Sequence, residues 1–133
     1  MSAGGRVPFQ YVVLRCVPRV DREEFVNVGV VLYCQARDFL AVAVHVDAAR
    51  LTALDPGVDV EGVTLAAQAL QRTCDGEGPA GQTSLGQRFR WLTAPRSTVV
   101  QPGPVHTGLT EDPDAEADRL LRLLVLPVAP PRS

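Results

Sequence analysis

The first third of the chain contains three segments whose apolar residues follow the pattern of β-strands. Residues 9–17 are rich in β-branched and aromatic types and are apolar on both sides, which indicates a strand buried on both faces. Residues 25–34 place valines and a leucine at the even positions, and residues 39–46 repeat this alternation. The short link over 35–38 suits a hairpin. We therefore predict an antiparallel three-stranded meander.

Four later segments are predicted as helices from their apolar spacing or their capping residues. Asp47, Asp59 and Asp112 each precede such a segment and are good N-cap residues. Pro113 fits the first helical position of the last segment. The predicted helices cover residues 48–54, 60–74, 85–92 and 113–126.

The remaining segments are polar or rich in proline. We expect residues 75–84 to form a polar loop and residues 98–101 a short strand. Pro102 and Pro104 then favour an edge strand or a loop over a central strand. The fold class is therefore predicted as α+β, an antiparallel sheet led by the three-stranded meander with helices packed on one face.

The length of 133 residues suits one domain of ordinary size. We expect a flexible N-terminus over residues 1–8, a single α+β domain over 9–126 and a proline-rich tail over 127–133. The N-terminus lacks the apolar run of a signal peptide, and no stretch has the length of a membrane span. These features predict a cytoplasmic protein without contact to a membrane.

The charge and the cysteine content argue against nucleic-acid binding and against a metal site. The net charge is −2, and the arginines are scattered rather than clustered, so nucleic acid is not the expected partner. Lysine and isoleucine are absent, a bias typical of high-GC bacterial genomes of actinobacterial type. The three cysteines, Cys16, Cys34 and Cys74, are widely spaced, so we expect them to be free and buried, with no metal site. No motif for a nucleotide or another cofactor is present, and none is predicted.

Arg15 and Asn27 are the first candidate site residues. Arg15 interrupts an apolar strand, either because its guanidinium reaches solvent or a nearby acid, or because it binds an anion. Asn27 and Gly29 either mark a β-bulge or open a ligand site. A hairpin centred near Asp21 would pair Arg15 with Asn27, and Val13 with Gly29. We therefore expect Arg15 and Asn27 side by side on the less apolar face of the sheet.

Further candidates lie in loops. Arg22 and Glu24 belong to a charged loop, which is usually a solvated surface. An arginine and a serine after a helix could hold an anion, and a histidine titrates near neutral pH, although a lone histidine between prolines is more often structural. These loop candidates are Arg96, Ser97, Gln101 and His106.

Two segments resemble a known bacterial family. The stretch YVVLRCVPRVDREEFVNVGVVLYC has the family's opening pattern, a Tyr-x-x-Leu-Arg-x-x-Pro strand followed by Glu-x-x-Asn-Val-Gly-Val-Val-Leu. The stretch FRWLTAPRSTVVQPGPVHTGLTEDP is similar to its C-terminal part. Together they resemble the family called domain of unknown function 3037, which has no assigned activity. The resemblance also implies an association with HipA-like kinases.

These observations leave two classes of function open. The absence of catalytic motifs favours a non-enzymatic interaction or regulatory module that binds a protein partner. The alternative is a small-anion sensor or enzyme that uses Arg15, Asn27, Arg96 and His106. A pocket in which these four residues converge would favour the alternative, and their dispersal would favour the interaction module.

Overall fold

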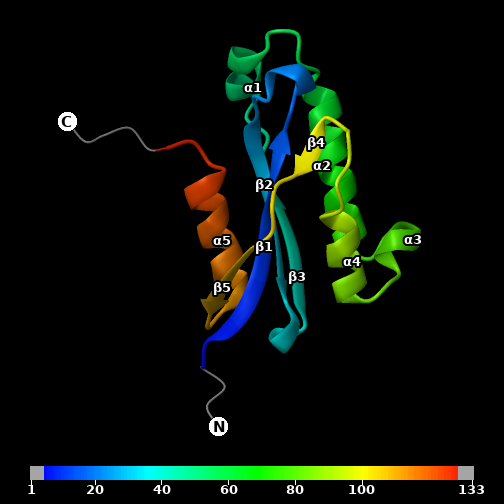
Figure 1. Ribbon diagram of the computed structural model, residues 1–133, viewed down its shortest axis with the longest axis vertical. Helices are drawn as coiled ribbons and strands as arrows, with labels where there is room; N and C mark the ends of the chain where they lie inside the picture. Colours follow the sequence, from blue (N-terminus) through cyan, green and yellow to red (C-terminus); the bar gives the residue numbers. More distant parts are fainter. Residues whose placement is uncertain (1–4, 129–133) are drawn as a thin grey trace, which may run out of the picture.

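The computed structural model describes residues 5–128 and contains a mixed set of strands and helices (Figure 1). Two short 3-10 turns, η1 (Val20–Arg22) and η2 (Gln35–Arg37), follow the first two strands. The strands are β1 (Val7–Cys16), β2 (Val26–Cys34), β3 (Phe39–Val44), β4 (Val100–Pro102) and β5 (His106–Thr110). The helices are α1 (Ala48–Leu54), α2 (Val60–Cys74), α3 (Gly78–Gly81), α4 (Leu85–Leu92) and α5 (Pro113–Leu124).

The strands form one antiparallel sheet in which β1 has neighbours on both sides. The order is β3-β2-β1-β4, and β5 pairs with the other half of β1. The predicted α+β class and the meander of β1, β2 and β3 are thus confirmed. The short strand expected over residues 98–101 corresponds to β4, which pairs at an edge of the sheet, whereas no strand was expected over residues 106–110, where β5 forms. Pro102 and Pro104 do not prevent these strands, because they lie at the end of β4 and in the break between two short edge strands.

A β-bulge in β2 changes which side chains face which way. Leu14 pairs with Gly29 and Arg15 pairs with Asn27, so Val28 is an extra residue without an opposite partner on β1. The expected pairing of Val13 with Gly29 is therefore wrong; Val13 pairs with Val30. The bulge explains the error, because the pairing shifts by one residue beyond it.

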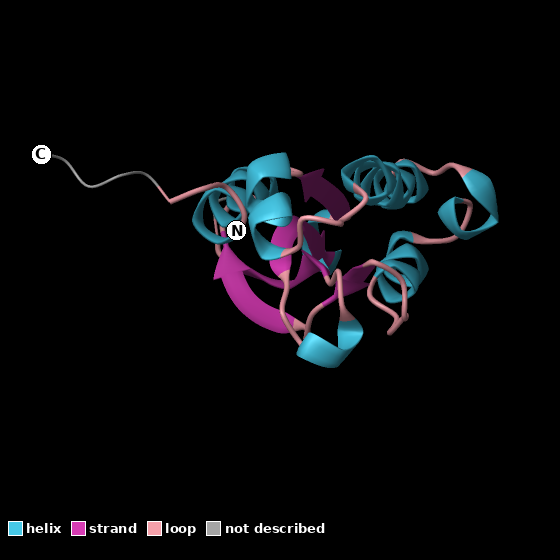
Figure 2. Cartoon of the chain, turned by 90° about the horizontal axis from the view of Figure 1, so that it is seen from above, coloured by secondary structure: helices cyan, strands magenta, loops and turns pink. Residues whose placement is uncertain are grey.

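The bulge also distributes the apolar side chains of β2 over both faces of the sheet. Val26 and Val28 lie on one face with Val31, whereas Val30 and Leu32 lie on the other. Other elements must therefore pack on both faces of the sheet to bury these side chains. Figures 1 and 2 show α5 on one side of the sheet and α2 and α4 on the other. The expectation that the helices pack on one face is therefore wrong for α5, which packs on the opposite face from α2 and α4.

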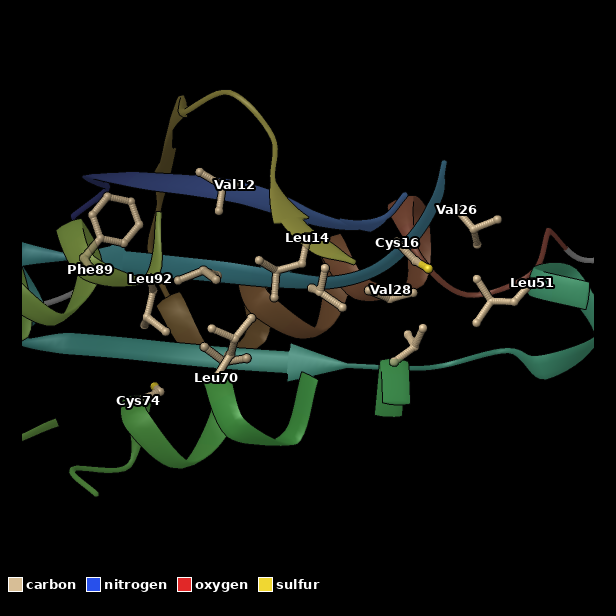
Figure 3. Close-up of a cluster of buried hydrophobic side chains, with 14 residues drawn as sticks. Val12, Leu14, Cys16, Val26, Val28, Leu51, Leu70, Cys74, Phe89 and Leu92 are labelled. Carbon is tan, nitrogen blue, oxygen red and sulfur yellow. The ribbon is translucent and has the colours of Figure 1, made fainter. Parts of the chain in front are cut away.

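The larger apolar cluster lies between the sheet and the helices α2 and α4 (Figure 3). Val12, Leu14 and Cys16 of β1 are fully buried there. The smaller cluster packs α5 against the opposite face through Ala117 and Leu120. At about 25 cal/mol per Å² of apolar surface, these two layers supply the main stabilisation of the fold.

The N-caps predicted from the sequence are formed. The side chains of Asp47, Asp59 and Asp112 accept hydrogen bonds from backbone N–H groups of the first helical turns. At α4, Ser84 and Gln87 form a reciprocal capping box. One short helix, α3, lies where only a loop was expected.

The ends of the chain differ from the expectation where the structure describes them. β1 begins at Val7, so part of the expected flexible N-terminus belongs to the sheet. Residues 1–4 of that segment, and residues 129–133 of the expected proline-rich tail, lie outside the described residues.

Candidate functional site

One face of the sheet carries a row of polar side chains across three strands. Arg15 on β1 lies between Asn27 on β2 and Gln101 on β4, because the register pairs it with both. Directly opposed residues of neighbouring strands point to the same side of the sheet. The predicted pairing of Arg15 with Asn27 is thus confirmed, and Gln101 joins the same row.

The side chain of Asn27 is hydrogen-bonded within the protein. Its side-chain amide donates a hydrogen bond to the carbonyl oxygen of Leu124 at 2.9 Å. Leu124 ends α5, and the last carbonyls of a helix have no partner within the helix. The Nη1 atom of Arg50 donates to the next carbonyl, that of Val125, at 2.8 Å. Asn27 therefore attaches the end of α5 to the sheet.

Arg15 has no such engagement. Its guanidinium carbon lies 4.0 Å from the centre of the Phe25 ring, a cation–π stack. Its Nε atom is buried and has no hydrogen-bond partner, and none of the ion pairs found within residues 5–128 includes Arg15. A buried donor without a partner costs about 1–3 kcal/mol and is uncommon in folded proteins. Arg15 is thus held in place by stacking, and no hydrogen bond or ion pair within residues 5–128 occupies its guanidinium.

A hollow of about 350 Å³ opens beside this guanidinium. This volume is at the low end of the range for ligand pockets. Gly103 borders the guanidinium closely, since a Cβ atom at Gly103 would lie 2.6 Å from Nη2 of Arg15. The lining combines apolar and polar side chains: Arg15, Val17, Val20, Glu23, Phe25 and Gln101.

A second stack lies further along the same face. The His106 ring of β5 is exposed and lies against Tyr11 of β1, with ring centres 5.1 Å apart. Tyr11 is four residues from Arg15 on the same strand, so both side chains point to the same side, about 13 Å apart. We call this surface the open face and define it by Tyr11, Arg15, Phe25, Gln101 and His106.

Arg22 and Glu24 lie in a different hollow, of about 230 Å³, at the end of β1. They form an exposed ion pair with each other, which raises the pKa of Arg22 above its ordinary value, mainly through the hydrogen bond from Arg22 to Glu24. In the same hollow Arg19 pairs with Asp55 at 3.2 Å. The pKa of Asp55 is lowered, first by a hydrogen bond from the backbone N–H of Gly57. The charges of this hollow satisfy one another, so it has no unpaired group for a ligand.

Arg96 and Ser97 are also separate from Arg15. The Arg96 guanidinium stacks on Trp91 of α4, 4.7 Å from the ring centre, and donates to the Trp91 carbonyl oxygen. Burial lowers the pKa of Arg96 from its ordinary value. Ser97 is exposed in the loop that follows. Because α4 packs on the face opposite to α5, these two residues do not contribute to the open face.

Two aromatic members of the open face were not among the candidates from the sequence. Phe25 has the same parity as Asn27 and precedes it by two residues, so it lies diagonally within reach of Arg15. Tyr11 has the same parity as Arg15 on β1. The alternation of the strands contains this signal.

Residues 5–128 contain no cluster of the usual metal-ligating side chains. No group of three or more His, Cys, Asp or Glu side chains in this range could hold a metal ion. Cys16, Cys34 and Cys74 are free and buried. No helix in the described part of the chain is long and apolar enough to cross a membrane.

Residues 11–125 match the model of a family described as Protein of unknown function (DUF3037). No curated protein and no solved structure matches the chain. The matched range includes every residue of the open face.

Proposed function

This chain belongs to the DUF3037 family, whose description states no activity, and we propose that it is a non-enzymatic interaction module that binds a protein partner through the open face. The observation that carries the proposal is the arginine stacked on a phenylalanine that is itself 44% exposed. An exposed apolar ring and a half-buried, unpaired cation lie together at one place. Their cost to the isolated chain is explained if a partner covers them.

The composition of the open face supports this proposal. Arginine and aromatic residues are enriched in protein interfaces and supply most of their binding energy. The two stacks, Arg15 on Phe25 and His106 on Tyr11, restrict these side chains before binding. Binding therefore costs less side-chain entropy than it would with free rotamers.

The distribution of the candidate residues favours binding over catalysis. Asn27 is bonded to α5, and Arg96 is stacked on Trp91. The His106 ring is stacked on Tyr11, with ring centres 5.1 Å apart. A catalytic site needs such groups within hydrogen-bond distance of one another.

Copurification with quantitative comparison of variants tests the proposal. The tagged chain is expressed in its native host as wild type, as Tyr11→Ala/His106→Ala and as Leu109→Ala, and the bound proteins are quantified by mass spectrometry. Leu109 is the matched control, because it is exposed on β5 and pairs with Pro8, on the other side of the sheet. A HipA-like kinase, the partner implied by the family resemblance, is the first purified protein for reconstitution.

The proposal predicts a partner that the double variant loses by about tenfold or more and that Leu109→Ala retains, with the same ranking after reconstitution from purified components. A partner lost equally in both variants would contradict the assignment to the open face. The absence of any stoichiometric partner, together with turnover that His106→Ala abolishes, would favour an enzyme.

A further inference from the structure

The side chains that line the hollow beside Arg15 indicate which chemical group of a partner would bind there. This inference rests on the proposed function. Arg15 is a permanent cation with five N–H donors in a planar fork. Its Nε is buried without a partner among residues 5–128, so a ligand reaches the guanidinium through the two Nη atoms at the end of the fork. The complementary group is therefore a planar anion that accepts two parallel hydrogen bonds, and a carboxylate has this geometry.

The other walls of the hollow select what is attached to that carboxylate. Val17, Val20 and Phe25 form an apolar wall next to the guanidinium, and Val20 is 66% exposed. Gln101 adds an amide that can donate or accept. The walls thus fit a carboxylate with an apolar side chain directly beside it.

We propose that this hollow binds the C-terminal carboxylate of a partner chain whose last residue is apolar. A chain end carries the carboxylate and the apolar side chain on one Cα atom, so both reach the adjacent walls together. An Asp or Glu side chain would satisfy Arg15 but would leave the apolar wall uncovered. The small volume suits a single residue rather than a folded element.

The charge of Glu23 predicts whether its removal strengthens or weakens the binding of a ligand in this hollow. Its exposed side chain lines the hollow, so it weakens the attraction for an anion. An exposed charge acts weakly through solvent. Glu23→Gln should therefore strengthen carboxylate binding by about twofold, whereas it would weaken the binding of a cation.

The experiment is an NMR titration of the ¹⁵N-labelled chain with N-acetyl-L-leucine, which mimics an apolar chain end. Saturable shifts are expected in the Nε–Hε signal of Arg15 and the side-chain amide of Gln101. N-acetyl-L-leucinamide, which lacks the charge, should leave both signals unchanged. Arg15→Met should weaken the binding by about tenfold or more, as expected for a lost charge-assisted pair. Arg15→Lys should restore only part of it, because an ammonium cannot pair with two parallel bonds.

Arg19→Met is the matched control, since Arg19 lies in the other hollow, and it should leave the titration unchanged. N-acetyl-L-aspartic α-amide tests a side-chain carboxylate, and free L-leucine tests a small zwitterion. Tighter binding of either than of N-acetyl-L-leucine would overturn the proposal. Equal chemical-shift changes with the uncharged amide would also overturn the proposal. This comparison uses the wild-type chain, so it does not depend on whether a variant folds. If no probe binds but a partner is still captured through the open face, only this inference fails; if the probes bind and no partner is found, the proposed function fails.

Discussion

Gly29 is the residue at which β2 changes the direction of its side chains. It lies next to the bulged Val28, and neighbouring strands approach it closely. A Cβ atom at this position would lie 2.8 Å from the carbonyl oxygen of Ala43 and 3.1 Å from a methyl group of Val44. Only glycine lets the backbones of β2 and β3 remain at this distance.

Gly29→Ala should therefore destabilise the fold by about 1–3 kcal/mol, as overpacking in a core does. Chemical denaturation measures the free energy of unfolding. Gly57→Ala is the control, because a Cβ at Gly57 would meet only a carboxylate oxygen of Asp55 at 3.5 Å. Equal stability of the two variants would show that the close approach at Gly29 has no energetic consequence.

Cys16 links burial to a pH dependence of stability. Burial raises the pKa of its thiol from 9.0 to about 11. The unfolded chain then loses this proton at a lower pH than the folded chain, so stability is fully present below pH 9.0 and falls as the pH rises toward 11. Cys16→Ala should make this decline shallower, measured as the difference in unfolding free energy across that range. An unchanged slope would exclude Cys16 as its source.

At the scale of elements, α5 depends on two side chains that hold its C-terminal end. Asn27 of β2 donates to the Leu124 carbonyl and Arg50 of α1 to the Val125 carbonyl. These bonds join three elements that are distant in sequence. The bond from Asn27 also gives a polar side chain inside an apolar strand its hydrogen-bond partner.

Asn27→Ala should lower the free energy of unfolding by about 1–2 kcal/mol, because it leaves a helical carbonyl without its donor. Amide hydrogen exchange should accelerate most in the last turn of α5. Gln10→Ala, at an exposed position of β1, should change neither quantity. Uniform acceleration over the whole sheet would instead indicate a role in strand pairing.

The elements differ in how far the sequence predicts them. The helix at 85–92 is found with the same bounds, since its cap and spacing act locally. β5 was not predicted, because its pairing with β1 depends on contacts between residues about 100 positions apart in the sequence. For the candidate site, the pairing of Arg15 with Asn27 followed from strand parity. The separate position of Arg96 could not be predicted, because it depends on how α4 packs.

At the scale of the whole molecule, the two faces of the sheet have different roles. α2 and α4 cover one face with the larger core, whereas α5 packs chiefly on β2 and β3 of the other. Beside α5 the open face keeps an arginine, three rings and a glutamine accessible to solvent or half-buried. This asymmetry is the central basis of the proposed function.

Hydrogen exchange of the purified complex with its captured partner tests this claim most directly. The account predicts that added protection of backbone amides gathers in β4, in β5 and in residues 17–25, which border the open face, while α2 and α4 exchange as in the free chain. Protection confined to α2 and α4, with the open face unchanged, would contradict it.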